Sequence, residues 1–402
     1  MDKLLRFNRH FESDFFYEVG HPRECYPELE SRFELPLMLG LFGLRRVGKT
    51  TTLRHLINYL ITSRKIDRSK ILYFSFDDPK YGVWDVIRLY EQYIGTKIDS
   101  SFYFFFDEVQ KVPEWEVAIK ELYDTYKCQV CISGSESAVI QKSTDSLAGR
   151  IYEHQLEPLT FTEYLQFTNQ SHLLGKNIDL TNQYESYLYR QFPETVSFTI
   201  TQTTEYIKSI IRKILNEDIP KFFVVRDTEL LMRLFMMIVH KPGILIDFNA
   251  ISQELGVSRN TISSYFGILE QSFLIKKVYN YSQNMLTSEK KLKKYYTYPA
   301  LHYTCTEISL LVESHMLMQS QIQFFWRNPR KEEVDFICAQ PFIAGEVKYK
   351  NHIHKSDLQT LETFSQKIGA KPVLITKYAS IIHATHGLVQ LYPWQIRDYL
   401  FT

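Results

Sequence analysis

The sequence lacks long apolar runs and an N-terminal leader pattern. No apolar stretch reaches the roughly 18 residues that a membrane-spanning helix needs. The longest candidate, at 230–239, is interrupted by Arg233. Residues 1–16 alternate charged and aromatic side chains and contain no continuous apolar segment, which a secretory signal peptide requires. We therefore expect a cytoplasmic protein without a membrane partner.

An excess of charge of either sign is also missing. Lysine and arginine number 47 and acidic residues 46, which gives a formal net charge of +1. The field of the whole chain therefore cannot attract nucleic acid, and any such contact has to come from a local basic patch. Internal repeats and low-complexity linkers are absent too, so domain boundaries have to be inferred from changes of pattern.

The few cysteines have no zinc-binding spacing. They are Cys25, Cys128, Cys131, Cys305 and Cys338, an odd set that is typical of a reducing compartment. Cys128 and Cys131 form a C-x-x-C pattern, but they lie in an apolar, strand-like run. We interpret both thiols as sheet residues rather than as a redox or metal pair.

The distribution of apolar residues indicates several domains. At 402 residues the chain is long for one core, and roughly two to four domains are expected. Strand-like runs at 35–42, 71–76, 102–106 and 129–132 alternate with helical patterns, which predicts a parallel sheet covered by helices. From 161 to about 240 the apolar spacing is helical throughout, which predicts a helical lid or subdomain.

A glycine-containing loop follows the first of these runs. Its sequence, Gly43-Leu44-Arg45-Arg46-Val47-Gly48-Lys49-Thr50, fits G-x-x-x-x-G-K-[ST], and a helical pattern at 51–61 comes after it. In such a P-loop, backbone N–H groups surround the phosphates, Lys49 reaches the β- and γ-phosphate oxygens, and Thr50 binds Mg²⁺. The predicted nucleotide-binding residues are those of the loop, from Gly43 to Thr50, together with Thr51. Arg45 and Arg46 either touch phosphate or hold the N-terminal segment, and we favour the structural role.

An acidic pair ends the strand-like run at 102–106. Asp107 and Glu108 follow that run in the manner of a Walker B strand. Asp107 is expected to order the magnesium shell, and Glu108 to orient, or take a proton from, the water that attacks the γ-phosphate. The alternative is that both acids only cap the next turn. Because strand, acids and upstream loop coincide, we predict an ATPase with ATP and Mg²⁺ as cofactors.

Residues 248–269 have the pattern of a helix-turn-helix. Gly256 marks the turn, Ser258 is expected to cap the second helix, and Arg259 and Asn260 are expected to face outward. The strand-like run at 273–278 and the basic run at 290–294 are candidates for a wing. DNA binding and a winged-helix spacer with a solvated lysine loop fit the pattern equally well.

The C-terminal part carries acids on predicted strands. Strands are predicted at 323–326, 333–338, 342–349 and 372–376, with a helix at 355–368. Glu346 and Lys348 alternate on one strand and therefore share a face, and a hairpin can bring Asp335 beside them. Two carboxylates and a lysine suit a second Mg²⁺ site, in which the lysine orients the attacking water or stabilises the charged phosphate. The alternative is an exposed, charged sheet edge.

This C-terminal pattern resembles the D-x(n)-E-x-K core of restriction-endonuclease-like proteins. In that family an upstream helix often adds an acid, and Glu313 is suitably spaced to be a metal ligand together with Asp335 and Glu346. Nearly the whole chain resembles prokaryotic AAA+-type ATPases that end in a nuclease-like domain of unknown function. The resemblance rests on 43–56, FDDP at 76–79, FFDEVQKVPEWE at 105–116, SGSES at 133–137, LAGR at 147–150, and EVDF with EVKYK at 333–336 and 346–350.

The resemblance implies roles for three further residues. Ser133 or Ser135 becomes the polar sensor of the γ-phosphate. Arg150 becomes a candidate arginine finger, which would act in trans and so require a homo-oligomer. The alternative for Arg150 is a salt bridge that shapes the lid.

Together these patterns predict an α/β chain with an AAA+-like parallel sheet. The expected domains are a P-loop ATPase core at 1–165, a helical lid at 166–240, a winged-helix domain at 241–298 and a restriction-endonuclease-like domain at 299–402. We expect an ATP-hydrolysing switch that controls the nuclease-like domain, with DNA as candidate substrate. The alternative is an ATP-gated DNA-binding or scaffold protein whose silent nuclease fold docks a protein partner.

Overall fold

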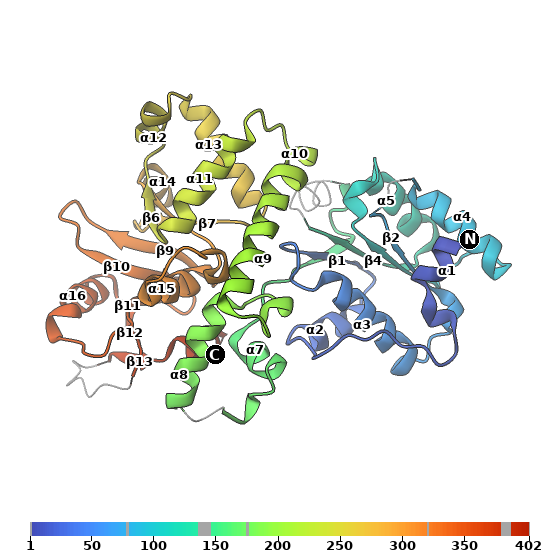
Figure 1. Cartoon of the computed structure of the whole chain (residues 1–402), viewed down its shortest axis with the longest axis horizontal. Helices are drawn as coiled ribbons and strands as arrows, with labels where there is room; N and C mark the ends of the chain where they lie inside the picture. Colours follow the sequence, from blue (N-terminus) through green and yellow to red (C-terminus); the bar gives the residue numbers. More distant parts are fainter. Residues whose placement is uncertain are drawn as a thin grey trace. The chain divides into compact units, whose positions relative to one another are not determined.

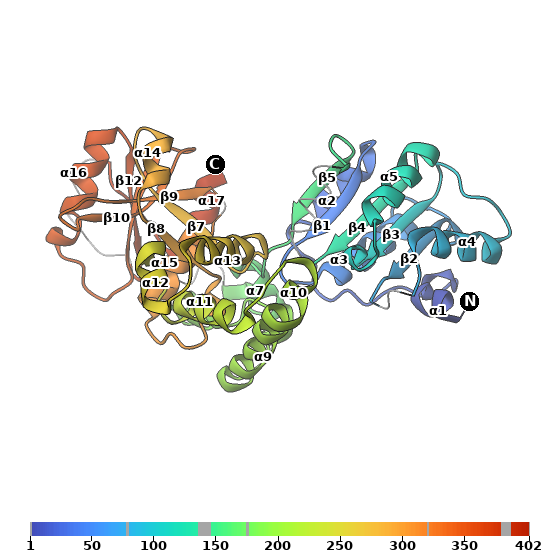
Figure 2. The same cartoon turned by 90° about the horizontal axis from the view of Figure 1, so that it is seen from above.

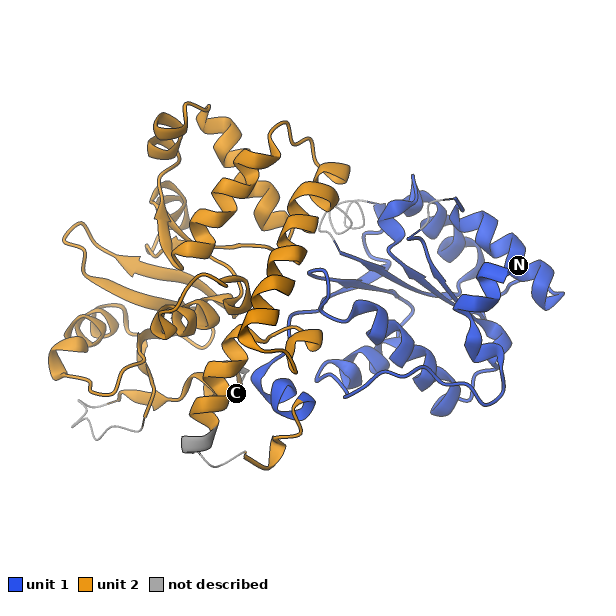
Figure 3. Cartoon of the chain, viewed as in Figure 1, with its two compact units in different colours: residues 1–167 blue, residues 168–402 orange. Residues whose placement is uncertain are grey.

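The computed structural model describes residues 2–77, 80–135, 146–173, 177–319, 321–378 and 387–401. The chain forms two compact units, Met1–Phe167 and Thr168–Thr402 (Figure 3). Among the described helices none is both long and apolar enough to cross a membrane.

Unit 1 is built on a parallel five-stranded sheet with the order β2-β3-β4-β1-β5 (Figure 1). The strands are β1 Met38–Phe42, β2 Ile71–Ser75, β3 Tyr103–Asp107, β4 Gln129–Gly134 and β5 Ile151–Gln155. The first four are buried along nearly their whole length, as expected of continuous apolar runs. The sequence analysis did not predict β5, because this half-buried edge strand, Ile-Tyr-Glu-His-Gln, has no apolar run.

The helices of unit 1 are α1 Asp2–Phe7, α2 Tyr26–Ser31, α3 Lys49–Thr62, α4 Val83–Ile94, α5 Trp115–Tyr126 and α7 Phe161–Phe167. Of these, α1, α3 and α5 contact strands of the sheet. In α3 the fully buried side chains include Leu53, Leu56 and Leu60, which recur at helical spacing. They belong to one core cluster with Leu41 of β1 and Phe105 of β3. The predicted strand, loop and helix are therefore present in that order.

The first half of unit 2 is helical, as predicted. Its helices are α8 Asn177–Tyr189, α9 Ile200–Lys213, α10 Ile219–Phe222, α11 Thr228–His240, α12 Phe248–Leu255 and α13 Arg259–Gln271, followed by α14 Met285–Lys290. Helix α12 ends at Gly256, whose φ of 64° suits glycine. The Ser258 hydroxyl caps α13 by accepting from the Thr261 N–H at 3.1 Å. Helix, turn and helix thus lie where the sequence predicts them.

The second half of unit 2 is an eight-stranded mixed sheet with the order β13-β12-β11-β10-β9-β7-β8-β6. Its strands are β6 Ile244–Ile246, β7 Lys276–Asn280, β8 Lys293–Tyr296, β9 Ile322–Arg327, β10 Glu333–Cys338, β11 Ile343–Lys348, β12 Lys371–Thr376 and β13 Val389–Leu391. Strand β7 pairs with β9, so segments on both sides of residue 299 share one sheet. The four-domain division stays a prediction.

Two of the later helices lie on opposite faces of this sheet, on either side of β10 (Figure 2). They are α15 Ile308–Met318 and α16 Gln359–Ile368; α17 Ile396–Phe401 follows near the C-terminus. Helix α16 buries Leu361 and Phe364 against Val334 of β10. Residues 333 and 335 alternate with 334 and therefore face α15, which carries Glu313.

Candidate functional site

The loop between β1 and α3 has the backbone of a phosphate-binding nest. Gly43, Arg46 and Gly48 have φ values of 143°, 72° and 103°. A Cβ atom on Gly43 would lie 2.2 Å from the Leu156 carbonyl oxygen, so only glycine fits at this position of the loop. The buried Lys49 ammonium donates to the Gly43 and Leu44 carbonyls at 3.0 and 2.8 Å. The lysine therefore lies against a loop of the kind that surrounds phosphate with backbone N–H groups.

The predicted magnesium ligands of unit 1 are in contact. The Thr50 hydroxyl donates to Asp107 Oδ2 at 2.6 Å, and the Ser133 hydroxyl donates to Asp107 Oδ1. The Tyr73 hydroxyl donates to Oδ2 at 3.1 Å. Burial, followed by the charge of Glu108, raises the pKa of Asp107 above its ordinary value. A hydroxyl and a carboxylate side by side are the oxygen donors that Mg²⁺ takes, so these residues fit the ion.

Glu108 is held in place by two side chains. The Gln110 amide donates to its Oε2 at 2.7 Å, and the Ser135 hydroxyl donates to its Oε1 at 2.8 Å. Its φ of 54° is uncommon for a residue other than glycine, and such strain concentrates at functional sites. Of the two predicted sensor serines, Ser135 contacts Glu108 and Ser133 contacts Asp107.

Tyr73 and Gln110 are site residues that the sequence analysis did not select. Tyr73 lies in the apolar run of β2, where its hydroxyl gives no local signal, whereas Gln110 stands inside the FFDEVQ motif and could have been noticed. Residues 78–79 of FDDP and 136–137 of SGSES lie outside the described residues.

The candidate arginines occupy different places. Arg45 is half-buried and Arg46 is exposed. Arg150 forms a two-point ion pair with Asp124, at 2.9 and 3.1 Å. The Arg150 carbonyl accepts from the N–H of Met38, so Arg150 lies beside the first residue of β1. The P-loop follows Phe42, at the opposite end of the same strand. At about 3.3 Å per residue the two places are roughly 15 Å apart, so Arg150 cannot be a finger in its own chain's site. A role in trans stays a prediction.

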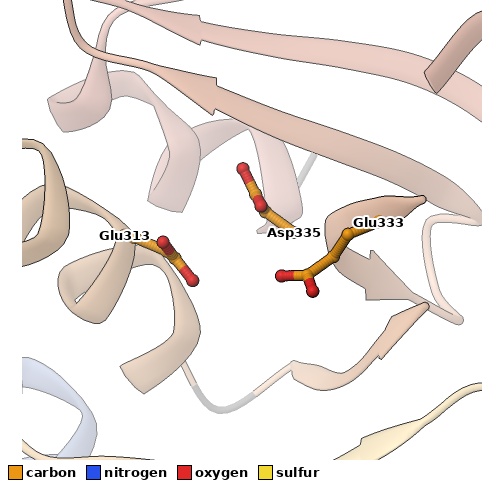
Figure 4. Close-up of side chains that lie close together, drawn as sticks. All are labelled: Glu313, Glu333 and Asp335. Atoms are coloured by element: carbon orange, nitrogen blue, oxygen red, sulfur yellow. The ribbon is translucent and has the colours of Figure 1, made fainter. Parts of the chain in front are cut away.

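Unit 2 contains a cluster of half-buried carboxylates. Glu313 of α15 and Glu333 and Asp335 of β10 have oxygens within 4.8 Å of one another, and Figure 4 shows these side chains directed toward a common space. Glu313 and Asp335 were predicted metal ligands. Glu333 was not, although its position two residues before Asp335 places both on one face of the strand.

A lysine from another strand occupies this cluster. Lys294 of β8 is 5% exposed, and its Nζ contacts Glu333 Oε1 and lies 3.3 Å from Glu313 Oε1. The Tyr296 hydroxyl donates to the same Glu313 oxygen at 2.6 Å. The interpretation of 290–294 as a solvated loop is therefore wrong for Lys294, because strand alternation turns this residue inward against the carboxylates.

Glu346 and Lys348 extend the cluster on β11. Lys348 Nζ contacts Glu346 Oε1, whereas Glu346 Oε2 accepts no hydrogen bond from any described residue, although the side chain is 7% exposed. Asp335 Oδ2 accepts from the Val347 N–H at 2.8 Å. Burial, then the charges of Glu346 and Glu313, raise the pKa of Asp335 well above its ordinary value. An unpaired buried oxygen beside interacting acids fits a divalent cation.

Two family models match parts of the chain. Residues 36–165 match the AAA domain, and residues 181–308 match a domain of unknown function (DUF8612). The first match covers the P-loop and the Walker B acids. Neither of the two covers Glu333, Asp335 or Glu346, so the restriction-endonuclease-like prediction has no support from them.

Two similar proteins are both described as uncharacterized. Uncharacterized protein MJ1637 of Methanocaldococcus jannaschii is 22% identical over 98% of this chain and 90% of its own length. An uncharacterized protein of Haemophilus influenzae is 30% identical over 60% of this chain and 61% of its own length. A solved Thermotoga maritima RuvB mutant is 18% identical, and the match covers 63% of this chain and 86% of that chain with a TM-score of 0.30.

Proposed function

We propose, on the premise that residues 36–165 form an AAA domain, that the chain binds ATP with Mg²⁺ in unit 1 and hydrolyses it. The observation that carries the proposal is the 2.6 Å contact between the Thr50 hydroxyl and the Asp107 carboxylate. These are the two protein groups with which P-loop NTPases hold Mg²⁺. Local sequence pattern and long-range geometry thus agree on one site.

Each residue of the site has a defined task in hydrolysis. The loop N–H groups and Lys49 bind the phosphates, and Thr50 with Asp107 holds the ion. Bound Mg²⁺ neutralises phosphate charge. Glu108 orients the attacking water and accepts its proton, and Gln110 and Ser135 fix the carboxylate for this task. Ser135 also lies beside Glu108 where it can report the loss of the γ-phosphate.

Thr50→Ala tests the proposal through its dependence on magnesium. Removing the hydroxyl deletes one ligand of the ion, so the affinity for ATP in Mg²⁺ should fall about tenfold, since such a contact is worth about 1.5 kcal/mol. The affinity in EDTA should not change. Calorimetric titration with ATP, with and without Mg²⁺, measures both values.

Thr62→Ala is the matched control, because Thr62 is an exposed threonine of the same helix. Its hydroxyl donates to the Asn58 carbonyl of the helix backbone at 2.8 Å. This variant should bind as the wild type does. Equal Mg²⁺ dependence of Thr50→Ala and the wild type would contradict the role of Thr50.

The nucleotide state, in this proposal, controls unit 2. DNA is the candidate partner, since Arg259, Asn260 and Ser264 are exposed on the second helix of the helix-turn-helix. A homo-oligomer would allow Arg150 to act on a neighbouring subunit. In the alternative, unit 2 only binds DNA or docks a protein and has no chemistry of its own.

A second candidate function is metal-assisted phosphodiester hydrolysis in unit 2. Glu346 Oε2, buried and without a hydrogen bond from the described residues, favours it. Glu313, Asp335 and Glu346, with Glu333 adjacent, would hold a divalent cation through oxygen. Such an ion polarises a phosphate and activates water. Lys348 would orient that water or stabilise the charged phosphate.

Asp335→Asn is expected to abolish Mn²⁺ binding in unit 2 and any cleavage of supercoiled plasmid. The reason is that the Asp335 carboxylate lies beside those of Glu313 and Glu333 and interacts with Glu346, so its loss removes a shared oxygen ligand of the proposed ion. Calorimetry of Mn²⁺ binding without nucleotide and gel assays of plasmid measure the two effects. Unchanged Mn²⁺ binding by this variant would overturn the second function.

Two further variants sharpen that test. Glu332→Gln changes the neighbouring, exposed acid outside the cluster and should bind Mn²⁺ normally. Lys294→Met removes the ammonium that contacts Glu313 and Glu333, so it should tighten Mn²⁺ binding because lysine and metal compete for the same oxygens. Metal binding that is lost in Lys294→Met, while the protein stays folded, would contradict this competition.

A further inference from the structure

Arg23, an arginine of the N-terminal segment, donates a hydrogen bond to the backbone of the P-loop. The Arg23 side chain is 6% exposed, and its Nη1 donates to the Val47 carbonyl at 2.8 Å. Its Nη2 donates to the Glu157 carbonyl at 2.9 Å, on the connection between β5 and α7. Its Nε lies 2.8 Å from Glu163 Oε1. One guanidinium therefore joins the P-loop to two other parts of unit 1.

The contact with Val47 fixes the direction of a P-loop N–H group. A trans peptide is planar, so the carbonyl of Val47 and the N–H of Gly48 point in opposite directions. Because Arg23 holds that carbonyl, the Gly48 N–H is directed to the other side of the loop, away from the guanidinium. Gly48 has a φ of 103°, and its own carbonyl accepts from the Thr52 N–H at 2.9 Å. Because glycine adopts many conformations, the contact of Arg23 with the preceding carbonyl restrains the peptide on its other side.

Arg23 is itself firmly held. Glu163 is 2% exposed and also accepts from the N–H groups of Glu24 and Thr160, at 2.8 and 2.9 Å. Burial disfavours the charged guanidinium, but Glu163 outweighs it and raises the pKa of Arg23 above its ordinary value. The arginine is therefore a charged group in a fixed position, which is suited to orienting a peptide.

We infer that Arg23 is a positioning residue of the nucleotide site, which holds the Val47–Gly48 peptide so that the Gly48 N–H faces the phosphates. The inference rests on the proposed ATP binding in unit 1. Arg23 touches no nucleotide in this account. It acts by keeping one donor of the nest in place before the phosphates arrive, so that binding does not have to order the loop.

Arg23→Lys separates positioning from stability. Lysine keeps a positive charge beside Glu163, so the thermal midpoint without nucleotide should stay close to that of the wild type. One ammonium cannot replace a planar fork that contacts three groups, so the Kd for ATP in Mg²⁺ should rise about tenfold or more. Arg23→Gln should raise the Kd at least as much and also lower the thermal midpoint, because it leaves the buried Glu163 carboxylate without its positive partner.

Arg32→Gln is the matched control, since Arg32 pairs with Glu28 at the surface of the same segment at 2.9 Å. It should leave the Kd unchanged. If Arg23→Lys and Arg23→Gln both bind ATP with a Kd within threefold of the wild-type value, the inference is wrong and the proposed function is unaffected. A wild type that binds no ATP would instead overturn the proposed function, and the inference with it.

Discussion

Lys49→Ala is expected to lose measurable binding of ATP. Lys49 is 5% exposed, and its ammonium donates to the Gly43 and Leu44 carbonyls of the loop. Two charge-assisted hydrogen bonds to phosphate, worth about 1.5–3 kcal/mol each, correspond to an affinity loss of about a hundredfold or more. Calorimetric titration of the purified chain with ATP in Mg²⁺ measures the loss.

The control for Lys49→Ala is Lys120→Ala, which removes an exposed lysine of α5. It should bind ATP as the wild type does, which excludes a general effect of lost positive charge. If Lys49→Ala produces the same binding isotherm as the wild type, phosphate is not bound at this loop and the account of unit 1 fails.

Glu108→Gln is expected to bind ATP normally and to hydrolyse it at least about a hundredfold more slowly, since general-base catalysis contributes about two to four orders of magnitude. Glutamine keeps the shape of the side chain and can still accept from Gln110 or Ser135, but it cannot take a proton from water. Binding should persist because Lys49, Thr50 and the loop are untouched. Single-turnover release of phosphate, combined with the ATP Kd of the same preparation, measures both properties.

Glu114→Gln provides a control of the same chemistry. Glu114 also has a positive φ, 52°, and is exposed, so the variant tests whether any glutamate change at a strained position slows the reaction. It should hydrolyse ATP at the wild-type rate. Equal losses of ATP binding in Glu108→Gln and Lys49→Ala would refute the separate roles given to the two residues.

The arrangement of the proposed ATP site was largely predictable, because its sequence signals are local. The spacing from Gly43 to Thr50 and the acids after a buried run identify the loop and the Walker B strand without any knowledge of the sheet order. The contact between Thr50 and Asp107 follows once β1 and β3 belong to one parallel sheet. Tyr73 and Arg23 were not predictable in this way, because their roles depend on hydrogen bonds across the fold.

The acidic cluster shows where pattern reasoning stops. Alternation along the strand predicts that Glu346 and Lys348 share a face, and in the structure the two side chains are in contact. A run of lysines usually indicates solvated surface, so the contacts of Lys294 with the acids could not be predicted from its neighbours in sequence. They depend on the pairing of β7 with β9, which brings β8 toward β10. Glu333, by contrast, could have been assigned locally, because it lies two residues before Asp335 on β10 and shares its face of the strand. The roles of both residues in metal binding stay predictions.

The most direct test of the central claim is phosphate release from ATP by the wild-type chain, measured with and without Mg²⁺ against the Lys49→Ala background. We expect the wild type to release phosphate over repeated turnovers, to require Mg²⁺ for this release, and to exceed the phosphate release of Lys49→Ala. Phosphate release by the wild type that never exceeds that background, in protein that is folded, would contradict the conclusion that unit 1 is an ATPase.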